Sequence, residues 1–195
     1  MDNDAVMQEF EAAEAILKGH FILSSGFHSD TYLQCARVMM NASRGERLCR
    51  ELAARVSASD IGEIDMVVAP AMGGVVVGYE LARQLGVPGI FCERENGTFA
   101  IRRGFSFPEG ARILMVEDVV TTGKSSLEAM DCVKEHGGVV VGEASLVNRN
   151  AGGNPLPVPL VSLLNVVVPV FEPGMLPPHL KSIPAVKPGS RWLKA

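Results

Sequence analysis

From residue 64 onward, the chain alternates between short, almost continuously apolar segments and segments whose apolar residues recur at helical spacing. The apolar segments are IDMVVAP (64–70), VPGIFCER (87–94), ARILMVED (111–118), VVVGEASLVNR (139–149) and LVSLLNVVVPVF (160–171). Amphipathic helices are predicted between them at 73–86 and 123–138, and both end in glycine. A strand that is apolar on both faces has to be covered on both faces. The alternation therefore predicts an α/β fold with a doubly wound, mostly parallel sheet.

The segments outside this alternation have weaker patterns. Helices are predicted over 5–18, ending at Gly19, and over 41–59, where Ser43 and Glu46 have capping-box spacing. Residues 20–38 between them are typical of two short strands around a turn. Asn96-Gly97 is a turn signal within 94–108 and predicts a β-hairpin or a mobile loop that projects from the sheet. Residues 172–195 contain five prolines and are expected to form an irregular tail.

The chain is long enough for one domain with a substantial core. We expect a single domain over 1–195, made of a small N-terminal lobe (1–40), an α/β core (41–170) with a mobile loop at 94–107, and a tail (171–195). The net charge of −4 argues against a nucleic-acid partner. No apolar run approaches the length of a membrane span, the N-terminus lacks the apolar core of a signal peptide, and four cysteines lack C-x-x-C spacing. These features predict a soluble, cytoplasmic protein with buried, reduced thiols and no membrane partner.

Residues 116–126, VEDVVTTGKSS, combine the end of a nucleotide-binding P-loop with two acids. A P-loop requires glycine five positions before Gly123, and that position is Asp118. The segment is therefore predicted to be a different anion site. The backbone amides and hydroxyls of the turn suit a monoester phosphate. Glu117 and Asp118 would repel that phosphate, so they are expected to contact another part of the same ligand, such as sugar hydroxyls or a divalent cation. The alternative is an acidic cap on a Thr/Ser-rich helix start.

A second strand end carries VVAPAMGG, residues 67–74. Its glycines open a helix whose amides could face an anion, or they form no more than a tight strand-to-helix turn. Because ligands of open α/β sheets bind beyond the carboxyl ends of the strands, both strand ends are candidates for one site.

The acid-acid-x-x-T-T-G-x-S pattern at 117–125 resembles the signature of the phosphoribosyltransferases that use phosphoribosyl pyrophosphate (PRPP). GHFILSSGFHSDTYLQCARV (19–38) resembles the N-terminal base-recognition segment of the orotate phosphoribosyltransferases, and LVNRN (146–150) resembles their late strand with an arginine. ERENGTFAIRRGF (93–105) stands where that family has a mobile catalytic loop, and IPAVKPGSR (183–191) resembles the tail of a bacterial branch. The similarity runs from about residue 15 to the end.

This resemblance implies transfer of ribose 5-phosphate from PRPP to orotate, giving orotidine 5′-monophosphate and pyrophosphate in pyrimidine biosynthesis. It implies Mg²⁺ as cofactor and a homodimer whose loop reaches the neighbouring site. Arg94 and Asp118 would be catalytic, and Arg149 with Thr121 would bind orotate. No protein ligand for the metal is predicted. The PRPP-binding residues would be Glu117, Asp118, Val119, Val120, Thr121, Thr122, Gly123, Lys124 and Ser125. The alternatives are transfer to another base and a non-catalytic PRPP- or nucleotide-sensing regulator.

Three positions depart from the family pattern. The loop at 93–107 has no lysine, Met72-Gly73 replaces a Tyr-Lys pair, and Ser24 replaces a lysine near the base. Either Lys124 and the loop arginines take over the pyrophosphate contacts, or turnover is weakened. Arg102 and Arg103 could supply that charge or lie on the solvent face of a hairpin.

Overall fold

A computed structural model describes residues 1–23, 25–150 and 152–188. Its centre is a six-stranded sheet in the order β5-β4-β3-β6-β7-β8. The strands are β3 (Met66–Pro70), β4 (Gly89–Glu95), β5 (Thr98–Ile101), β6 (Arg112–Val120), β7 (Val139–Asn148) and β8 (Leu160–Asn165). All neighbouring pairs are parallel except β4 with β5. The predicted mostly parallel sheet is confirmed.

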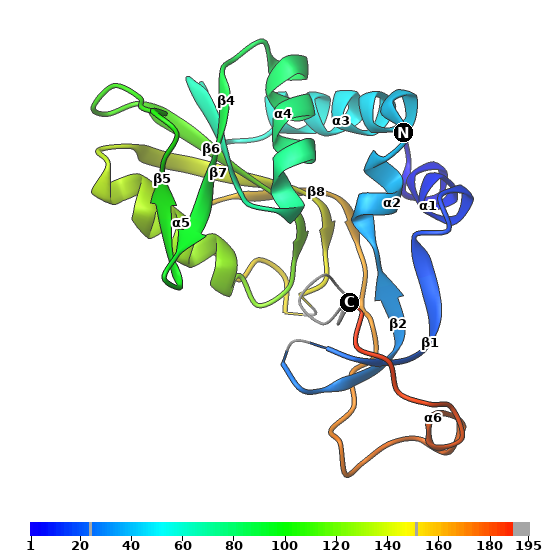
Figure 1. Cartoon of the computed structure of the whole chain (residues 1–195). Coiled ribbons are helices and arrows are strands. Elements are labelled where there is room, and N and C mark those ends of the chain that lie inside the picture. The colour runs from blue at the N-terminus through cyan, green and yellow to red at the C-terminus, as the bar shows by residue number, and fades with distance from the viewer. Residues whose placement is uncertain (24, 151, 189–195) are drawn as a thin grey trace.

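Helices cover both faces of this sheet, as the apolar strands require (Figure 1). On one face lie α3 (Ala42–Ser57) and α4 (Gly73–Leu85), with the shorter α1 (Asn3–Ala12) and α2 (Cys35–Met39) beside them. The other face is covered by α5 (Lys124–Glu135). Alternate residues of β6 consequently enter two separate hydrophobic clusters, Leu114 on the α3/α4 side and Ile113 on the α5 side. The first cluster extends to the carboxyl ends of the strands through Val147 and Leu164, next to the polar residues at that edge.

The helix predicted over 5–18 is wrong in its second half. Asp2 caps α1 by accepting a hydrogen bond from the Ala5 amide, and the helix ends at Ala12. Glu14 then takes a positive φ of 48°, which turns the chain away from the helix axis. The following residues form β1 (Ile16–Ile22), which pairs antiparallel with β2 (His28–Leu33). The helical spacing of the apolar residues predicted a longer helix, but residues 16–22 pair with β2 instead.

The start of α3 also differs from the prediction. Its cap is Asn41, whose side-chain oxygen accepts from the Arg44 amide at 3.0 Å. Ser43 lies inside the helix, so the capping-box assignment with Glu46 is wrong. The alignment of the apolar residues fits both starts, and only the backbone conformation at Asn41 distinguishes them.

The predicted hairpin is confirmed. β4 and β5 pair antiparallel around Asn96-Gly97, where both residues have positive φ (51° and 91°), as a two-residue primed turn requires. The tail carries one helical turn, α6 (Pro178–Lys181), and lies against the β1–β2 lobe, with bridges from Phe171 to His28 and from Val186 to Phe21. The four cysteines are free and buried, as predicted. Within the described ranges, no helix is long and apolar enough to cross a membrane.

Candidate active site

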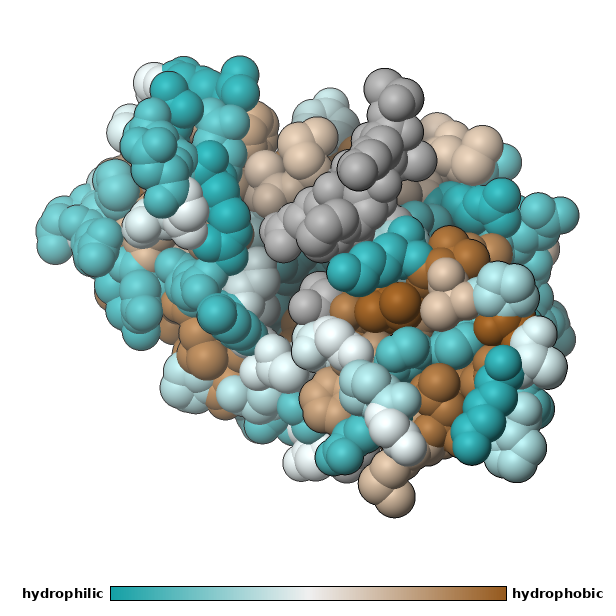
Figure 2. Space-filling view, turned by 60° about the horizontal axis from the view of Figure 1, so that its bottom comes forward, coloured by the Kyte–Doolittle hydropathy of each residue, from teal (hydrophilic) through white to brown (hydrophobic). Residues whose placement is uncertain are grey.

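A cleft of about 1480 Å³ lies at the carboxyl edge of the sheet, between the β6–α5 turn, the β4–β5 hairpin, the β1–β2 lobe and the tail. Figure 2 shows it as a hollow near the middle of the face, with hydrophilic surface along one side and hydrophobic patches on the other. Every residue predicted for the site lines this one cleft: Arg94, Glu117, Asp118, Val119, Val120, Thr121, Thr122, Gly123, Lys124, Ser125 and Arg149. Residues from three separate strands are thus brought together.

The β6–α5 turn forms the floor of the cleft. β6 continues to Val120, two residues past the predicted segment that ends at Asp118, and α5 begins at Lys124. Gly123 caps the helix with a φ of 75°, and a Cβ there would lie 2.7 Å from Leu156 Cδ2. Glycine is therefore needed both for the backbone conformation and for space. The first amides of this twelve-residue helix lack intrahelical partners and suit an anion, although the Lys124 amide also donates to Thr122 Oγ1 at 3.4 Å.

The two carboxylates lie at the end of β6, before the turn. Glu117 is buried, and this burial, with the charges of Asp118 and Glu143, holds its pKa well above the usual value. Burial also raises the pKa of Asp118, although its Oδ1 accepts a hydrogen bond from the Val119 amide at 2.8 Å. A dry environment disfavours both negative charges, so hydroxyl groups or a cation on a ligand would be favourable partners.

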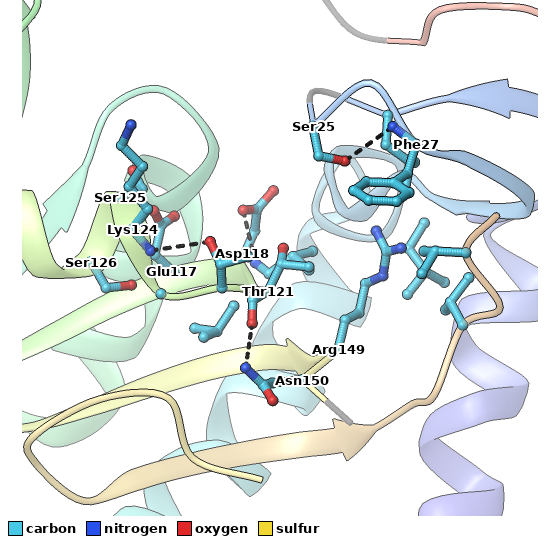
Figure 3. Close-up of a pocket in the computed structure, with 18 of the residues that line it drawn as sticks. Ser25, Phe27, Glu117, Asp118, Thr121, Lys124, Ser125, Ser126, Arg149 and Asn150 are labelled. Atoms are coloured by element: carbon cyan, nitrogen blue, oxygen red, sulfur yellow. Dashed lines mark hydrogen bonds between the residues drawn. The ribbon is translucent and has the colours of Figure 1, made fainter. Parts of the chain in front are cut away.

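Arg149 directly follows β7 and is tied to the turn through its backbone. Its amide donates to the Val120 carbonyl at 2.8 Å, and Asn150 Nδ2 donates to the Thr121 carbonyl at 2.9 Å. Figure 3 shows the guanidinium pointing across the cleft towards Phe27 of the lobe. Burial lowers its pKa, and within the described chain its Nε has no hydrogen-bond partner. A half-buried guanidinium with an unpaired, buried Nε is a ready site for a planar anion.

Arg94 reaches the cleft from the end of β4. Its guanidinium donates to the Gly97 carbonyl at 2.6 Å, forms an ion pair with Glu128 of α5, and lies 4.1 Å from the Phe99 ring centre. Lys124 is mostly exposed and lies 4.0 Å from the same Glu128. The cleft therefore has two cations at its hairpin side.

The other two hairpin arginines do not line the cleft. Arg103 donates to Glu93 at 3.0 and 3.1 Å, and Arg102 pairs with Glu95 at 3.3 Å. In this structure they lie on the solvent face of the hairpin, which was one of the two expectations for them. The departure predicted at Ser24 falls outside the described residues.

The second strand end, at 67–74, adjoins the same carboxylates. A Cβ on Gly73 would lie 2.8 Å from Asp118 Oδ1, and one on Gly74 would lie 2.6 Å from the Val116 carbonyl oxygen. The two glycines thus let α4 start against β6 and leave room for the Asp118 carboxylate. Met72 and Gly73 line a smaller cavity of about 530 Å³ that also contacts Asp118.

Sequence reasoning missed several lining residues. Phe27, Tyr32 and Gln34 come from the lobe, and Asn150 follows Arg149. Phe27 and Asn150 stand inside the motifs at 19–38 and 146–150, but nothing in their spacing shows which side chain faces a ligand. The two histidines of the 19–38 motif do not line the cleft and instead contact each other and the tail. His20 Nε2 and His28 Nδ1 lie 2.6 Å apart, and His20 Nδ1 contacts the Ile183 carbonyl of the tail at 2.9 Å.

Comparison with known proteins defines the class. Residues 39–172 match the family described as the phosphoribosyl transferase domain, and this range includes the whole six-stranded sheet and the β6–α5 turn. The chain therefore belongs to the phosphoribosyltransferase family, a family of transferases.

Its full-length relatives specify the branch. An orotate phosphoribosyltransferase of Sphingopyxis alaskensis is 53% identical over 196 residues, covering 100% of both chains. One of Brucella ovis is 51% identical over 191 residues, covering 98% of this chain and 99% of the relative. The crystal structure of the orotate phosphoribosyltransferase from Aeropyrum pernix matches with a TM-score of 0.67 and 26% identity, over 83% of this chain and 93% of that one. Within the phosphoribosyltransferases, the chain belongs to the orotate phosphoribosyltransferase family.

Proposed function

We propose that this protein transfers the ribose 5-phosphate group of PRPP to orotate, forming orotidine 5′-monophosphate and pyrophosphate in pyrimidine biosynthesis. The observation that carries the proposal is the half-buried guanidinium of Arg149 in the same cleft as the β6–α5 turn. Orotate is a uracil ring with a carboxylate, and a planar two-pronged cation distinguishes it from uracil and from purines. The full-length match to orotate phosphoribosyltransferases supports the same substrate over another base and over a non-catalytic regulator.

Each part of the cleft would hold one part of the substrates. The turn from Thr121 to Ser125 would hold the 5′-phosphate through backbone amides and hydroxyls. Glu117 and Asp118 would bind the ribose through its hydroxyls, so that the acids contact the sugar and not the phosphate. Arg149 would bind the orotate carboxylate, and Thr121 would hydrogen-bond the base beside it. Val119 and Val120 would line the ribose-phosphate path.

Catalysis would rest on positioning and electrostatics, because the anomeric carbon develops oxocarbenium character as pyrophosphate leaves. Asp118 would orient the ribose and stabilise its positive charge. Arg94 would neutralise the departing pyrophosphate. To do so, Arg94 has to break its ion pair with Glu128 and bind the pyrophosphate instead. Both side chains are partly exposed, so they can separate without moving the protein core. We expect the 94–107 loop to close over the cleft and exclude water, which would otherwise hydrolyse PRPP.

We propose Mg²⁺ as the cofactor. The described residues contain no group of three His, Cys, Asp or Glu side chains that could hold a metal ion by itself. The donor set therefore fits an ion carried mainly by the pyrophosphate and ribose oxygens, which is how Mg²⁺ commonly binds phosphates. When bound, Mg²⁺ would neutralise charge on the leaving group.

The test is a base-selectivity assay. Purified protein with PRPP and Mg²⁺ receives orotate, uracil or hypoxanthine, and the ultraviolet change of each base is followed. We expect consumption of orotate alone, and only with both PRPP and Mg²⁺ present. The Arg149→Lys variant keeps the positive charge but loses the planar, two-pronged donor group, so it should lose orotate selectivity. The same change at an exposed site, Arg50→Lys, serves as the matched control. Equal consumption of uracil by the wild type would refute the orotate assignment.

We also propose that the protein is a homodimer. Met40, Met72, Val76 and Tyr79 form an exposed apolar patch on and beside α4, and Met72 and Tyr79 are 83% and 70% exposed. A second copy of this chain would bury the patch, and the patch adjoins Asp118 through the smaller cavity. The Val76→Glu variant should sediment as a monomer, whereas Val139→Glu, an apolar-to-charge change at an exposed site elsewhere, should not. A wild type that sediments as a monomer would refute the dimer.

We further propose that the protein works in the cytoplasm. Four free, buried cysteines are typical of a reducing compartment. Cell fractionation with an antibody against the chain tests this location.

A further inference from the structure

Two glutamates of the sheet lie beneath the first turn of α5. Glu117 is on β6, and Glu143 is on the neighbouring β7 with 0% of its surface exposed. Ser126 Oγ donates to Glu143 Oε1 at 2.7 Å, and a hydrogen bond from Ser125 acts on Glu117. Figure 3 shows both serines at the start of α5, beside Glu117. Two consecutive serines of the phosphate turn are therefore each held by a buried carboxyl group.

Glu143 is only partly satisfied. Its Oε2 is buried, and among the described residues it has no hydrogen-bond partner. β8 has no charged residue, and β6 contributes Glu117 and Asp118 at the cleft end and Arg112 at the opposite end of the strand. The charged side chains of α5 lie at the surface, exposed or half-exposed: Lys124, Glu128, Asp131, Lys134 and Glu135. α3 packs on the opposite face of the sheet. Burial raises the pKa of Glu143 to about 7, and the bond from Ser126 opposes this shift.

We propose that Glu143 is a positioning residue for the phosphate turn, and that it takes up a proton from solvent when the phosphate of PRPP binds. This inference rests on the proposed function, because it takes the turn as the phosphate site. Through Ser126, Glu143 sets the first turn of α5, whose amides face the phosphate. The turn lies directly above two buried carboxyl groups, which are shielded from water. A bound phosphate therefore brings negative charge close to them and disfavours their ionised forms. Protonation of Glu143 removes one of those charges without disturbing the bond to Ser126.

The sign of the pH effect follows from this geometry. In the free protein Glu143 titrates near pH 7, and a bound phosphate raises its pKa further. Below both values Glu143 is neutral with and without PRPP, so it does not oppose binding. Above the pKa of Glu143 in the free protein, Glu143 is ionised. PRPP binding then requires either that Glu143 takes up a proton or that the phosphate binds above a negatively charged carboxylate. PRPP affinity should therefore fall as pH rises from about 7, by about tenfold for each unit by which the phosphate raises the pKa.

The experiment compares the wild type with Glu143→Gln, which keeps the shape of the side chain and cannot titrate. PRPP binding is measured by calorimetry in pairs of buffers with different ionisation enthalpies, across neutral to mildly alkaline pH, so that proton uptake is counted directly. We expect the wild type to take up more protons per PRPP than the variant. The KM for PRPP should rise with pH more steeply in the wild type, while kcat at saturating PRPP changes little.

Three further variants separate the carboxyl group from general damage. Glu135→Gln makes the same chemical change at an exposed site of α5 and should match the wild type. Glu143→Asp keeps an acid and should keep the proton uptake. Ser126→Ala removes the hydrogen bond to Glu143 and should raise the KM for PRPP at every pH.

Wild-type proton uptake in Glu143→Gln would overturn the proposal. If Glu143→Gln does not fold, as thermal unfolding would show, a wild-type KM for PRPP in Ser126→Ala would overturn it instead. A wild type that neither binds PRPP nor consumes orotate refutes the proposed function. An active wild type with an unaltered Glu143→Gln profile refutes only the role of Glu143.

Discussion

Replacing Glu143 by glutamine should stabilise the folded protein increasingly as pH rises. The carboxyl group has a pKa of about 7 in the folded chain and 4.5 as its ordinary value. Because the folded value is the higher one, the folded state binds the proton more tightly, and stability is lost as pH rises through this window. The wild type therefore loses roughly 1 kcal/mol by about pH 5 and roughly 3 kcal/mol by about pH 8. Glutamine carries no such penalty at either pH.

The assay is thermal unfolding of both proteins without ligands at a series of pH values. The difference in Tm, variant minus wild type, should grow by about 4–8 °C between about pH 5 and pH 8 for a chain of this size. Any cost of the new amide group is independent of pH in this range, so the slope and not the offset is diagnostic. A Tm difference that stays constant with pH would refute the reasoning, because it would mean that Glu143 has an ordinary pKa.

The other predictions concern the cleft. Arg149→Ala should raise the KM for orotate by about 10- to 100-fold and that for PRPP far less, since it removes a half-buried charged hydrogen-bond donor; equal effects in steady-state kinetics would contradict its assignment. Asp118→Asn should lower kcat/KM for PRPP by about 100-fold without lowering the Tm, and wild-type kinetics would mean that the acid only caps a turn. Gly123→Ala should cost about 2 kcal/mol in urea unfolding because alanine disfavours a positive φ, and its Cβ meets Leu156; an unaffected midpoint would show that the turn adapts. Arg94→Ala should slow turnover in a stopped assay while leaving orotate binding intact, and unchanged turnover would exclude it from the leaving-group site.

Much of the core could be read from the chain because its signals are local. Continuous apolar runs such as 113–116 indicate strands buried on both faces, and Gly86 marks a helix end by its own conformational freedom. The site motif at 116–126 is contiguous, so the prediction that its acids and its turn contact one ligand needed no knowledge of tertiary contacts. The pattern failed at Glu14 and Asn41, where a single backbone conformation decided the boundary.

By itself, the sequence determined the class of fold, the alternation of strands and helices in the sheet, and the residues of the β6–α5 turn. Only the tertiary structure decided which groups meet: that Arg149 lies beside the turn, that Arg94 reaches Glu128, and that Glu143 lies unexposed beneath Ser126. The physical reason is that burial and charge interactions depend on distances through space, between strands that are far apart in the chain. An acid within an apolar run looks the same in the sequence whether its carboxyl group reaches solvent or is enclosed, and here enclosure sets its pKa.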